Sequence, residues 1–316
     1  MAEYRILNYK GADGEPRPGI AVGDRVLDVQ DALKGRGDIR FSPASNLTIL
    51  NKWADSEPVL EQLADEVERD KVRSVGLSSV KLMAPLLYPN AIYNAASNYV
   101  GHRIEMRGMS DRPETLSKEG QKPYIFLKSP MHCTIGPGDT IHLPPKDVSE
   151  AVDWEAELGV VIGKAGRSLN TGNARSIVAG YTIFNDLSIR DRQRTDWPNF
   201  RTDWFTSKSF ETSAPHGPWI VPAKQIPDPY KCKIDLYVDN RHEQDSIAGD
   251  MIFNIEDQIE YISARMTMLP GDLIATGTTP GVGKGVDKNR YLQPGNTVRI
   301  TIGGIGTLEN KCVAWH

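Results

Sequence analysis

The sequence predicts a mainly β fold of the α+β class, because one turn-and-strand pattern recurs along the chain. The pattern stands at residues 136–141, 269–274 and 293–298, which are GPGDTI, LPGDLI and QPGNTV. In each segment proline presets the second turn position and glycine allows the positive φ of the third, as a type II turn requires. Apolar and mostly β-branched residues follow each turn, which is typical of a strand.

Further apolar runs extend this β-rich region, and one helical pattern interrupts it. We expect additional strands at residues 157–162, 181–185, 233–238 and 306–314. A helix is predicted where apolar residues recur at the spacing of one helix face, namely Ile255, Ile259, Ile262 and Met266.

The chain is long enough for two units, so we expect a small N-terminal α/β domain at residues 1–85 and a larger catalytic domain at residues 86–316. Within the small domain the pattern predicts a hairpin from residues 4–9 and 19–29, an amphipathic helix at 58–72, and an exit towards a proline-punctuated link at 80–85.

Composition excludes several classes of partner. The formal net charge is −4, with 37 Lys and Arg against 41 Asp and Glu, so no overall positive field attracts nucleic acid or an anionic membrane. The three cysteines are odd in number and form no C-x-x-C pair, which excludes a zinc ribbon or a redox motif. With neither a signal peptide nor a membrane-length apolar run, we expect a cytoplasmic protein that binds a small molecule.

Three carboxylates stand at the ends of predicted strands. Glu155 and Glu157 are two residues apart and would share one face of a strand, where their like charges repel unless a cation lies between them. Asp186 ends the next strand. An all-oxygen site of this kind suits Mg²⁺ or Mn²⁺, and Ca²⁺ less well for catalysis. The alternative is that both glutamates line a solvated strand edge and Asp186 caps a helix that begins at Leu187.

Two further groups could carry catalysis. His102 and Glu105 lie three residues apart, so in a helix the carboxylate could orient the imidazole as a general base; a solvated surface pair is the alternative. Lys208 could offset charge that develops on an enolate. A helix after Asp186 would point Arg190 and Gln193 towards the same site, although by itself the charge of Lys208 or Arg190 is more often a surface charge.

A glycine-rich segment follows the predicted strand near residue 274. Residues 276–283, TGTTPGVG, lack the glycine and the hydroxyl residue that a phosphate-binding P-loop requires. Their backbone N–H groups could instead receive a small carboxylate, and a plain structural turn is the alternative.

Taken together, five motifs resemble the fumarylacetoacetate hydrolase superfamily, in its acylpyruvase and 2-hydroxyhepta-2,4-diene-1,7-dioate isomerase-like branch. They are N-Y-x-x-H-x-x-E at 98–105, E-x-E-L at 155–158, N-D at 185–186 followed by R-D at 190–191, K-S-F at 208–210, and T-G-T-x-x-G-V-G at 276–283. Their order and spacing agree over residues 90–316, and the small leading domain is similar to one that many members carry.

The resemblance implies a β-sandwich roll, a homodimer, and Mg²⁺ or Mn²⁺ held by Glu155, Glu157 and Asp186. It also implies that His102 and Glu105 form a catalytic dyad on a lid. The residues that it places against the oxygens of the substrate are Lys208, Arg190, Gln193 and Thr278. The polar segment at residues 106–122 is longer than in minimal members and would be the mobile part of the lid.

The function implied is metal-dependent hydrolysis of a carbon–carbon bond in a 2,4-dioxo acid of the acylpyruvate or fumarylpyruvate type, in the catabolism of aromatics or sugars. The same site could serve an isomerase, a hydratase or an oxaloacetate-type decarboxylase. A metal-binding or acid-binding dimer without catalysis is the third alternative. A panel of acylpyruvates, fumarylpyruvate, oxaloacetate and oxohepta-ene-dioates, assayed with Mg²⁺, would separate these functions.

Overall fold

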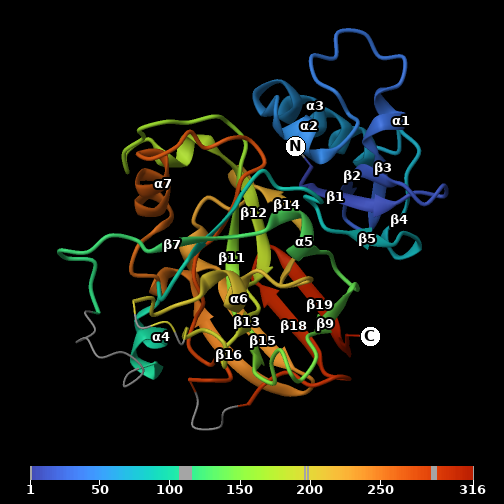
Figure 1. Ribbon diagram of the computed structural model, residues 1–316. Coiled ribbons are helices and arrows are strands. Elements are labelled where there is room, and N and C mark those ends of the chain that lie inside the picture. Colours follow the sequence, from blue (N-terminus) through green and yellow to red (C-terminus); the bar gives the residue numbers. More distant parts are fainter. Residues whose placement is uncertain (1, 107–115, 196, 198, 286–289, 316) are drawn as a thin grey trace.

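The structure is a computed structural model that describes residues 2–106, 116–195, 197, 199–285 and 290–315 (Figure 1). Within these residues a large sheet has twelve strands. Ten of them form one hydrogen-bonded row: β4 (Val75–Gly76), β3 (Arg25–Asp28), β2 (Pro16–Val22), β1 (Arg5–Lys10), β14 (Ala214–Pro222), β12 (Val178–Asn185), β11 (Ala156–Ile162), β17 (Leu273–Ala275), β6 (Ile92–Ala95) and β7 (Ile125–Lys128). Beside this row β5 (Leu82–Met83) pairs with β1, and β8 (Thr134–Ile135) pairs with β14.

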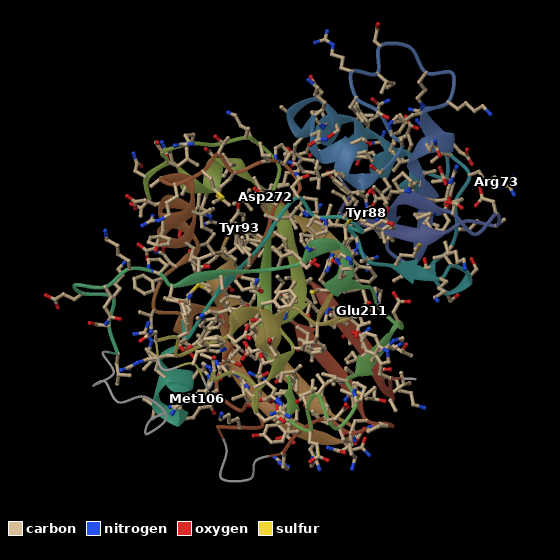
Figure 2. The ribbon with its side chains drawn as sticks, in the orientation of Figure 1. Arg73, Tyr88, Tyr93, Met106, Glu211 and Asp272 are labelled. Carbon is tan, nitrogen blue, oxygen red and sulfur yellow. The ribbon has the colours of Figure 1, made fainter. Side chains whose placement is uncertain are left out.

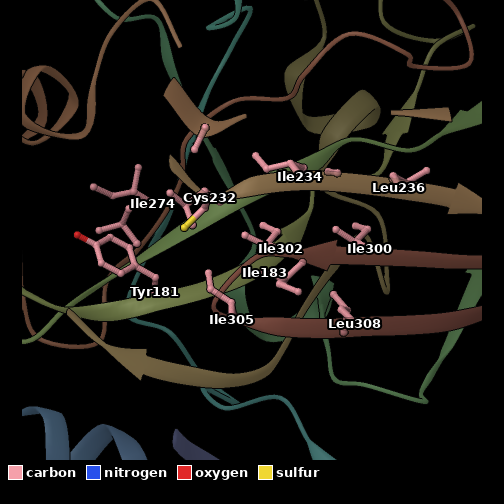
Figure 3. Packing of buried hydrophobic residues seen from close by; sticks show 14 of the residues in the cluster. Tyr181, Ile183, Cys232, Ile234, Leu236, Ile274, Ile300, Ile302, Ile305 and Leu308 are labelled. Atoms are coloured by element: carbon pink, nitrogen blue, oxygen red, sulfur yellow. The ribbon is translucent and has the colours of Figure 1, made fainter. Parts of the chain in front are cut away.

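A second sheet of five strands packs against the centre of the large sheet. Its order is β16 (Arg241–Ile247), β15 (Lys233–Val238), β18 (Thr297–Ile302), β19 (Gly306–Ala314) and β9 (Thr140–Leu143). Figure 3 shows the core between the two sheets, where Ile183 of β12 lies near Ile302 and Leu308 of the second sheet. This β-rich architecture confirms the predicted fold class. A two-stranded ribbon, β10 (Val152–Asp153) with β13 (Ser188–Ile189), stands apart.

The helices are short, apart from one in the N-terminal part. They are α1 (Val29–Leu33), α2 (Asn46–Leu50), α3 (Trp53–Glu68), α4 (Val100–Glu105), α5 (Pro130–Cys133), α6 (Trp204–Lys208) and α7 (Ile255–Ser263). Single 3₁₀ turns are η1 (Leu77–Ser79), η2 (Ala174–Ile177), η3 (Ala223–Gln225), η4 (Pro229–Lys231) and η5 (Ala248–Asp250). Among the described residues, no helix has both the length and the apolar character that a membrane span requires.

The three predicted type II turns are confirmed. Gly138, Gly271 and Gly295 have φ values of 75°, 87° and 99°, and a strand begins two residues after each of them. In every turn the fourth residue donates its N–H to the carbonyl of the first. The side chain of that fourth residue, Asp139, Asp272 or Asn296, accepts the N–H of the first residue in return. The reciprocal bonds explain why an Asx residue follows glycine each time.

The predicted helix near residue 255 is confirmed as α7, but it ends early. A capping box between Asn254 and Asp257 starts the helix, and its apolar face is buried. Met266, which we expected on that face, lies beyond the end of the helix and is 45% exposed. Its sulfur instead accepts a hydrogen bond of 3.0 Å from the hydroxyl of Tyr93. The position of Met266 is therefore set by its contact with Tyr93 of β6 and not by the face of α7.

The N-terminal part joins the large sheet rather than standing alone. The predicted hairpin contains one more turn than expected, because Gly23, at φ 59°, divides residues 19–29 into β2 and β3. The predicted helix at 58–72 begins earlier and forms α3, with Pro58 inside it. Strand β1 pairs with β14 at Ile6 and Ile220, and one hydrophobic cluster spans both parts. We propose that residue 85 marks a boundary between two subdomains that share a sheet.

Asp272, in the second of the three turns, makes the stability of the folded protein depend on pH. Figure 2 shows this residue close to Tyr93, near one end of the central strands. Burial raises the pKa of the Asp272 carboxyl to about 6, although the N–H of Leu269 partly stabilises the charged form. Because the folded pKa lies above the unfolded value of 3.8, the stabilising contribution of this group is present at low pH and is lost as the pH rises through 6.

We therefore expect Asp272→Asn to change the pH profile of stability. Asparagine can keep the turn, since Asn296 accepts the equivalent N–H at 2.8 Å in the third turn. Measured by thermal unfolding from about pH 4 to about pH 7, the melting temperature of the variant relative to wild type should rise with pH. A difference that stays constant over this range would contradict the assignment.

Candidate active site

The antiparallel pairing of β11 with β12 brings three carboxylates together. Ala156 faces Asn185 in the register, so Glu155, just before β11, lies beside Asp186, just after β12. The N–H of Asp186 donates to the carbonyl of Glu155 at 2.9 Å. Glu157 follows on β11, and each of these three residues offers an oxygen within 4.8 Å of the others. All three side chains are buried, which excludes the solvated strand edge considered from the sequence.

Lys208 bridges two of these carboxylates. It ends α6, a short helix whose first turn is capped by the Asp203 side chain. Its Nζ donates to Glu155 Oε2 at 2.8 Å and to Asp186 Oδ2 at 2.7 Å. Burial disfavours the charged ammonium, but Asp186 and Glu155 more than offset this and hold the pKa of Lys208 above its ordinary value. Lys208 is therefore a charged donor inside the site.

Lys128 is a second buried cation, which the sequence analysis missed. Its Nζ donates to Asp186 Oδ1 at 2.6 Å and to the carbonyl of Leu187 at 2.9 Å. Burial lowers the pKa of Lys128, and Asp186 opposes this effect. A local signal existed: in β7, Phe126 and Lys128 alternate with the exposed Leu127, so strand periodicity places Lys128 on the buried face.

Arg190 lies in the site, but a strand positions it rather than the predicted helix. Ser188 and Ile189 form β13, which pairs with β10, because Val152 faces Ile189 in the register. The Arg190 guanidinium donates to Asp153 Oδ2 at 2.8 Å and to Glu155 Oε1 at 2.6 Å. Asp153, buried and missed by the sequence analysis, is thus the partner that orients Arg190.

Gln193 lies in the loop after β13, and the predicted common helix face with Arg190 is wrong. Its backbone carbonyl accepts the N–H of Asp203, which begins the turn into α6. Between the described residues, no hydrogen bond joins the Gln193 side chain to the carboxylate group. The reason is that β13 is extended, so the spacing of a helix does not apply to residues 187–193.

The charge balance of the site favours a cation at Glu157. Four buried carboxylates, those of Asp153, Glu155, Glu157 and Asp186, face three buried cationic side chains, those of Lys128, Arg190 and Lys208. Burial raises the pKa of Glu157, and the neighbouring Asp186 and Glu155 raise it further. In contrast, burial of Glu155 is outweighed by Lys208, Arg190 and His102, so its pKa lies below the usual value. An all-oxygen group with excess negative charge fits a divalent cation such as Mg²⁺ or Mn²⁺.

The buried His102 and the partly buried Glu105 form a pair beside this group. Both lie on α4, and His102 Nδ1 is 2.7 Å from Glu105 Oε1. The other carboxylate oxygen of Glu105 accepts the N–H of Gly281 at 2.7 Å. Only 4% of His102 is exposed, so a solvated helix pair is excluded. A carboxylate on Nδ1 fixes the ring orientation and leaves Nε2 as the nitrogen that can exchange a proton.

The glycine-rich segment at 276–283 holds carboxylates of the protein itself. The N–H groups of Gly277, Gly281 and Gly283 donate to Glu157, Glu105 and Asp153. The sequence left open whether these amides receive a carboxylate of the substrate or form a plain turn; these three bind carboxylates of the protein. The hydroxyl of the buried Thr278 donates to the carbonyl of Ala156 at 3.1 Å and accepts from Gln244 at 2.9 Å.

The proposed lid segment at 106–122 lies largely outside the described residues, which resume at residue 116. Met106, at its start, lies next to α4 in Figure 2. At its end, Lys118 forms an ion pair of 3.0 Å with Asp257 in the first turn of α7. The described end of this segment is therefore tied to the large domain.

Sequence comparison places this arrangement among known proteins. The family described as fumarylacetoacetate (FAA) hydrolase, C-terminal, matches residues 91–313. The chain is also 36% identical, over 299 residues, to the oxaloacetate tautomerase YisK of Bacillus subtilis (strain 168). This alignment covers 93% of the chain and 95% of that protein.

Two solved structures have the same fold over their whole length. The maleylpyruvate hydrolase from Sphingobium sp. SYK-6, in complex with manganese(II) ion and pyruvate, matches with a TM-score of 0.76 at 26% identity, covering 99% of this chain and 100% of that one. The 5-carboxymethyl-2-hydroxymuconate delta-isomerase from Mycobacterium smegmatis matches with a TM-score of 0.71 at 30% identity, covering 99% of both chains. The chain therefore belongs to the fumarylacetoacetate hydrolase family.

Proposed function

We propose that this chain is a divalent-metal-dependent enzyme that interconverts the keto and enol forms of a small 2-oxo acid such as oxaloacetate. The observation that carries the proposal is the buried His102–Glu105 pair beside the carboxylates of Glu155, Glu157 and Asp186. The pair would supply a base through Nε2, the ring nitrogen that Glu105 does not contact, and the 36% identity to an oxaloacetate tautomerase supports this reaction. Unlike hydrolysis, this proton transfer requires no activated water molecule.

Glu155, Glu157 and Asp186 would hold Mg²⁺ or Mn²⁺, which is supported by the manganese in the related maleylpyruvate hydrolase. The bound cation would draw electrons from the 2-oxo group and so favour the enol. Ca²⁺ could occupy the same oxygen ligands, although its looser geometry suits catalysis less well.

The roles of the protein groups follow from their contacts. His102 Nε2 would take a proton from the carbon next to the 2-oxo group, which leaves an enolate, and would then deliver it to the enolate oxygen to give the enol. Lys208 donates two of its three hydrogens to carboxylates, so one can reach an oxygen of the substrate. Arg190 uses two of its five donors and can offer others to the substrate carboxylate. Gln193 and Thr278 are proposed as further substrate contacts.

Hydrolysis of a carbon–carbon bond in a 2,4-dioxo acid is the second candidate. It is supported by the related hydrolase, whose structure contains pyruvate. In this reaction the His102–Glu105 pair would activate a water molecule to attack the 4-oxo carbon. The reaction thus needs a water placed between the imidazole and the substrate, in addition to the groups used for proton transfer.

We also propose a homodimer, because aromatic side chains are unusually exposed around α6. Trp197, Phe200 and Phe205 are 72%, 67% and 75% exposed. Light scattering on the purified protein should give twice the chain mass of 35.0 kDa.

We also propose that the enzyme works in the cytoplasm, since its three cysteines are free and buried, as in a reducing compartment.

Binding of Mn²⁺ should stabilise the folded protein through Glu157. A cation that binds only the folded state adds about 2.7 kcal/mol at roughly 100 times its Kd, so the melting temperature should rise by several degrees. Glu157→Gln should lose this response. Without metal this variant should be at least as stable as wild type, because the glutamine oxygen can still accept the N–H of Gly277 and the repelled charge is gone.

The matched control is Asp245→Asn, in the exposed surface group of Asp235, His242 and Asp245. This variant should keep the full response to Mn²⁺. If wild type gains no stability from Mn²⁺ or Mg²⁺, or if Glu157→Gln gains as much as wild type, the proposed metal site is wrong.

His102→Ala should lower kcat for oxaloacetate tautomerisation about 10²- to 10⁴-fold, because it removes the general base. KM and the thermal response to Mn²⁺ should change little, since the imidazole is not among the proposed ligands. Glu105→Gln should have the same effect more mildly, by weakening the orientation of the ring. His132→Ala, at an exposed histidine, is the control and should retain activity.

The substrate panel separates the two candidates. Wild-type protein with Mn²⁺ should interconvert the forms of oxaloacetate faster than it cleaves acylpyruvates or maleylpyruvate. Cleavage of a 2,4-dioxo acid without tautomerase activity would establish the second candidate instead. The absence of both reactions in metal-loaded protein would refute the enzymatic proposal.

A further inference from the structure

The loop at residues 277–285 contacts each functional part of the proposed site. Its amide at Gly277 donates to Glu157 at 2.8 Å, and its amide at Gly281 donates to Glu105 at 2.7 Å. Gly283 N–H donates to Asp153 at 2.7 Å, and Asp153 in turn holds Arg190. One backbone segment thus orients a proposed metal ligand, the His102–Glu105 pair and the arginine proposed to bind the substrate carboxylate.

Helix α4 approaches this loop so closely that side chains would not fit between them. A Cβ on Gly101 would lie 2.8 Å from Pro280 Cγ. A Cβ on Gly285 would lie 2.5 Å from Glu105 Cδ and 2.6 Å from its Cγ. Real Cβ contacts are essentially never shorter than 3.0 Å. The absence of side chains at both glycines is therefore what allows α4 to lie against the loop.

Gly277 and Gly281 require glycine because of their backbone conformation, whereas Gly285 requires it only because of the space that Glu105 occupies. Gly277 and Gly281 have φ values of 102° and 104°, in the region that favours glycine, so an alanine there would strain the backbone. The φ of Gly285 does not lie in that region. Its backbone would accept alanine, and the added methyl group would meet only the flexible end of Glu105 among its nearest neighbours.

We propose that Gly285 is a positioning residue for the reaction: by leaving space for Glu105, it keeps that carboxylate between His102 and the Gly281 amide. This inference rests on the proposed role of His102 as the base. A methyl group at residue 285 must move Glu105 Cγ and Cδ by several tenths of an ångström. A shift of that size would disturb the two bonds of 2.7 Å by which Glu105 contacts His102 and Gly281, and so change the orientation of the imidazole.

Gly285→Ala should therefore lower kcat about 10- to 100-fold, as expected for a base displaced by up to 1 Å. KM and the stabilisation by Mn²⁺ should stay at wild-type values, because the atoms nearest to a Cβ at residue 285 all belong to Glu105 and none to Glu155, Glu157 or Asp186. The matched control is Gly37→Ala, where a Cβ meets nothing within 4 Å. Wild-type kcat in Gly285→Ala would overturn the proposal.

A double-mutant cycle shows whether Gly285 acts through Glu105. If it does, adding Gly285→Ala to Glu105→Gln should lower kcat by much less than it does in wild type, because the bond it disturbs is already weakened. Equal fold-losses in both backgrounds would show that Gly285 acts by another route, and would overturn the proposal.

Hydrogen exchange tests the contact itself, independently of activity and of how well Gly285→Ala folds. In Glu105→Ala the amide of Gly281 loses its acceptor and should exchange faster, whereas the amide of Gly277, bonded to Glu157, should not. Unchanged exchange at Gly281 would overturn the positioning role. If no 2-oxo acid reacts but Gly281 responds as expected, the proposed function fails while the contact between Glu105 and Gly281 stands.

Discussion

The pairing of β11 with β12 is the constraint on which the site depends. Because the strands are antiparallel, the start of one lies beside the end of the other, and Glu155 meets Asp186 although they are 31 positions apart in the sequence. The two-residue period of β11 then adds Glu157 to the same group. A shift of the register by one residue would turn these side chains to the other face, so the core packing between the two sheets also maintains the carboxylate group.

The buried carboxylates require compensating side chains around them. A carboxylate removed from water is costly unless a cation or several hydrogen bonds compensate it. Lys208 and Lys128 compensate Asp186, and Arg190 compensates Glu155. Glu157 has a backbone amide and no comparable ion pair in the described part of the chain. This imbalance makes the group receptive to a divalent cation. The side chains that compensate the other carboxylates come from three short elements, α6, β7 and β13, which converge here.

The glycine-rich loop contributes positioning rather than direct recognition. The amides of Gly277, Gly281 and Gly283 are committed to carboxylates of the protein, so these three cannot at the same time bind a carboxylate of the substrate. We propose that the substrate is instead recognised by side chains with donors left over, above all Lys208 and Arg190. Because α4 lies in close contact with the loop, the His102–Glu105 pair is held by the same loop backbone that orients Glu157.

The sequence by itself determined what depends on neighbours in the chain. The proline–glycine turns, the strands that follow them, the capped start of α7 and the strand-end carboxylates were predictable, because each rests on residues a few positions apart. The tertiary structure decided the pairing of charges: Lys128 reaches Asp186 across 58 residues, and Gly283 reaches Asp153 across 130. Gln193 was misplaced because local spacing suggested a helix where pairing with β10 imposes a strand. Such partners depend on strand order, and a pattern confined to one segment does not contain that order.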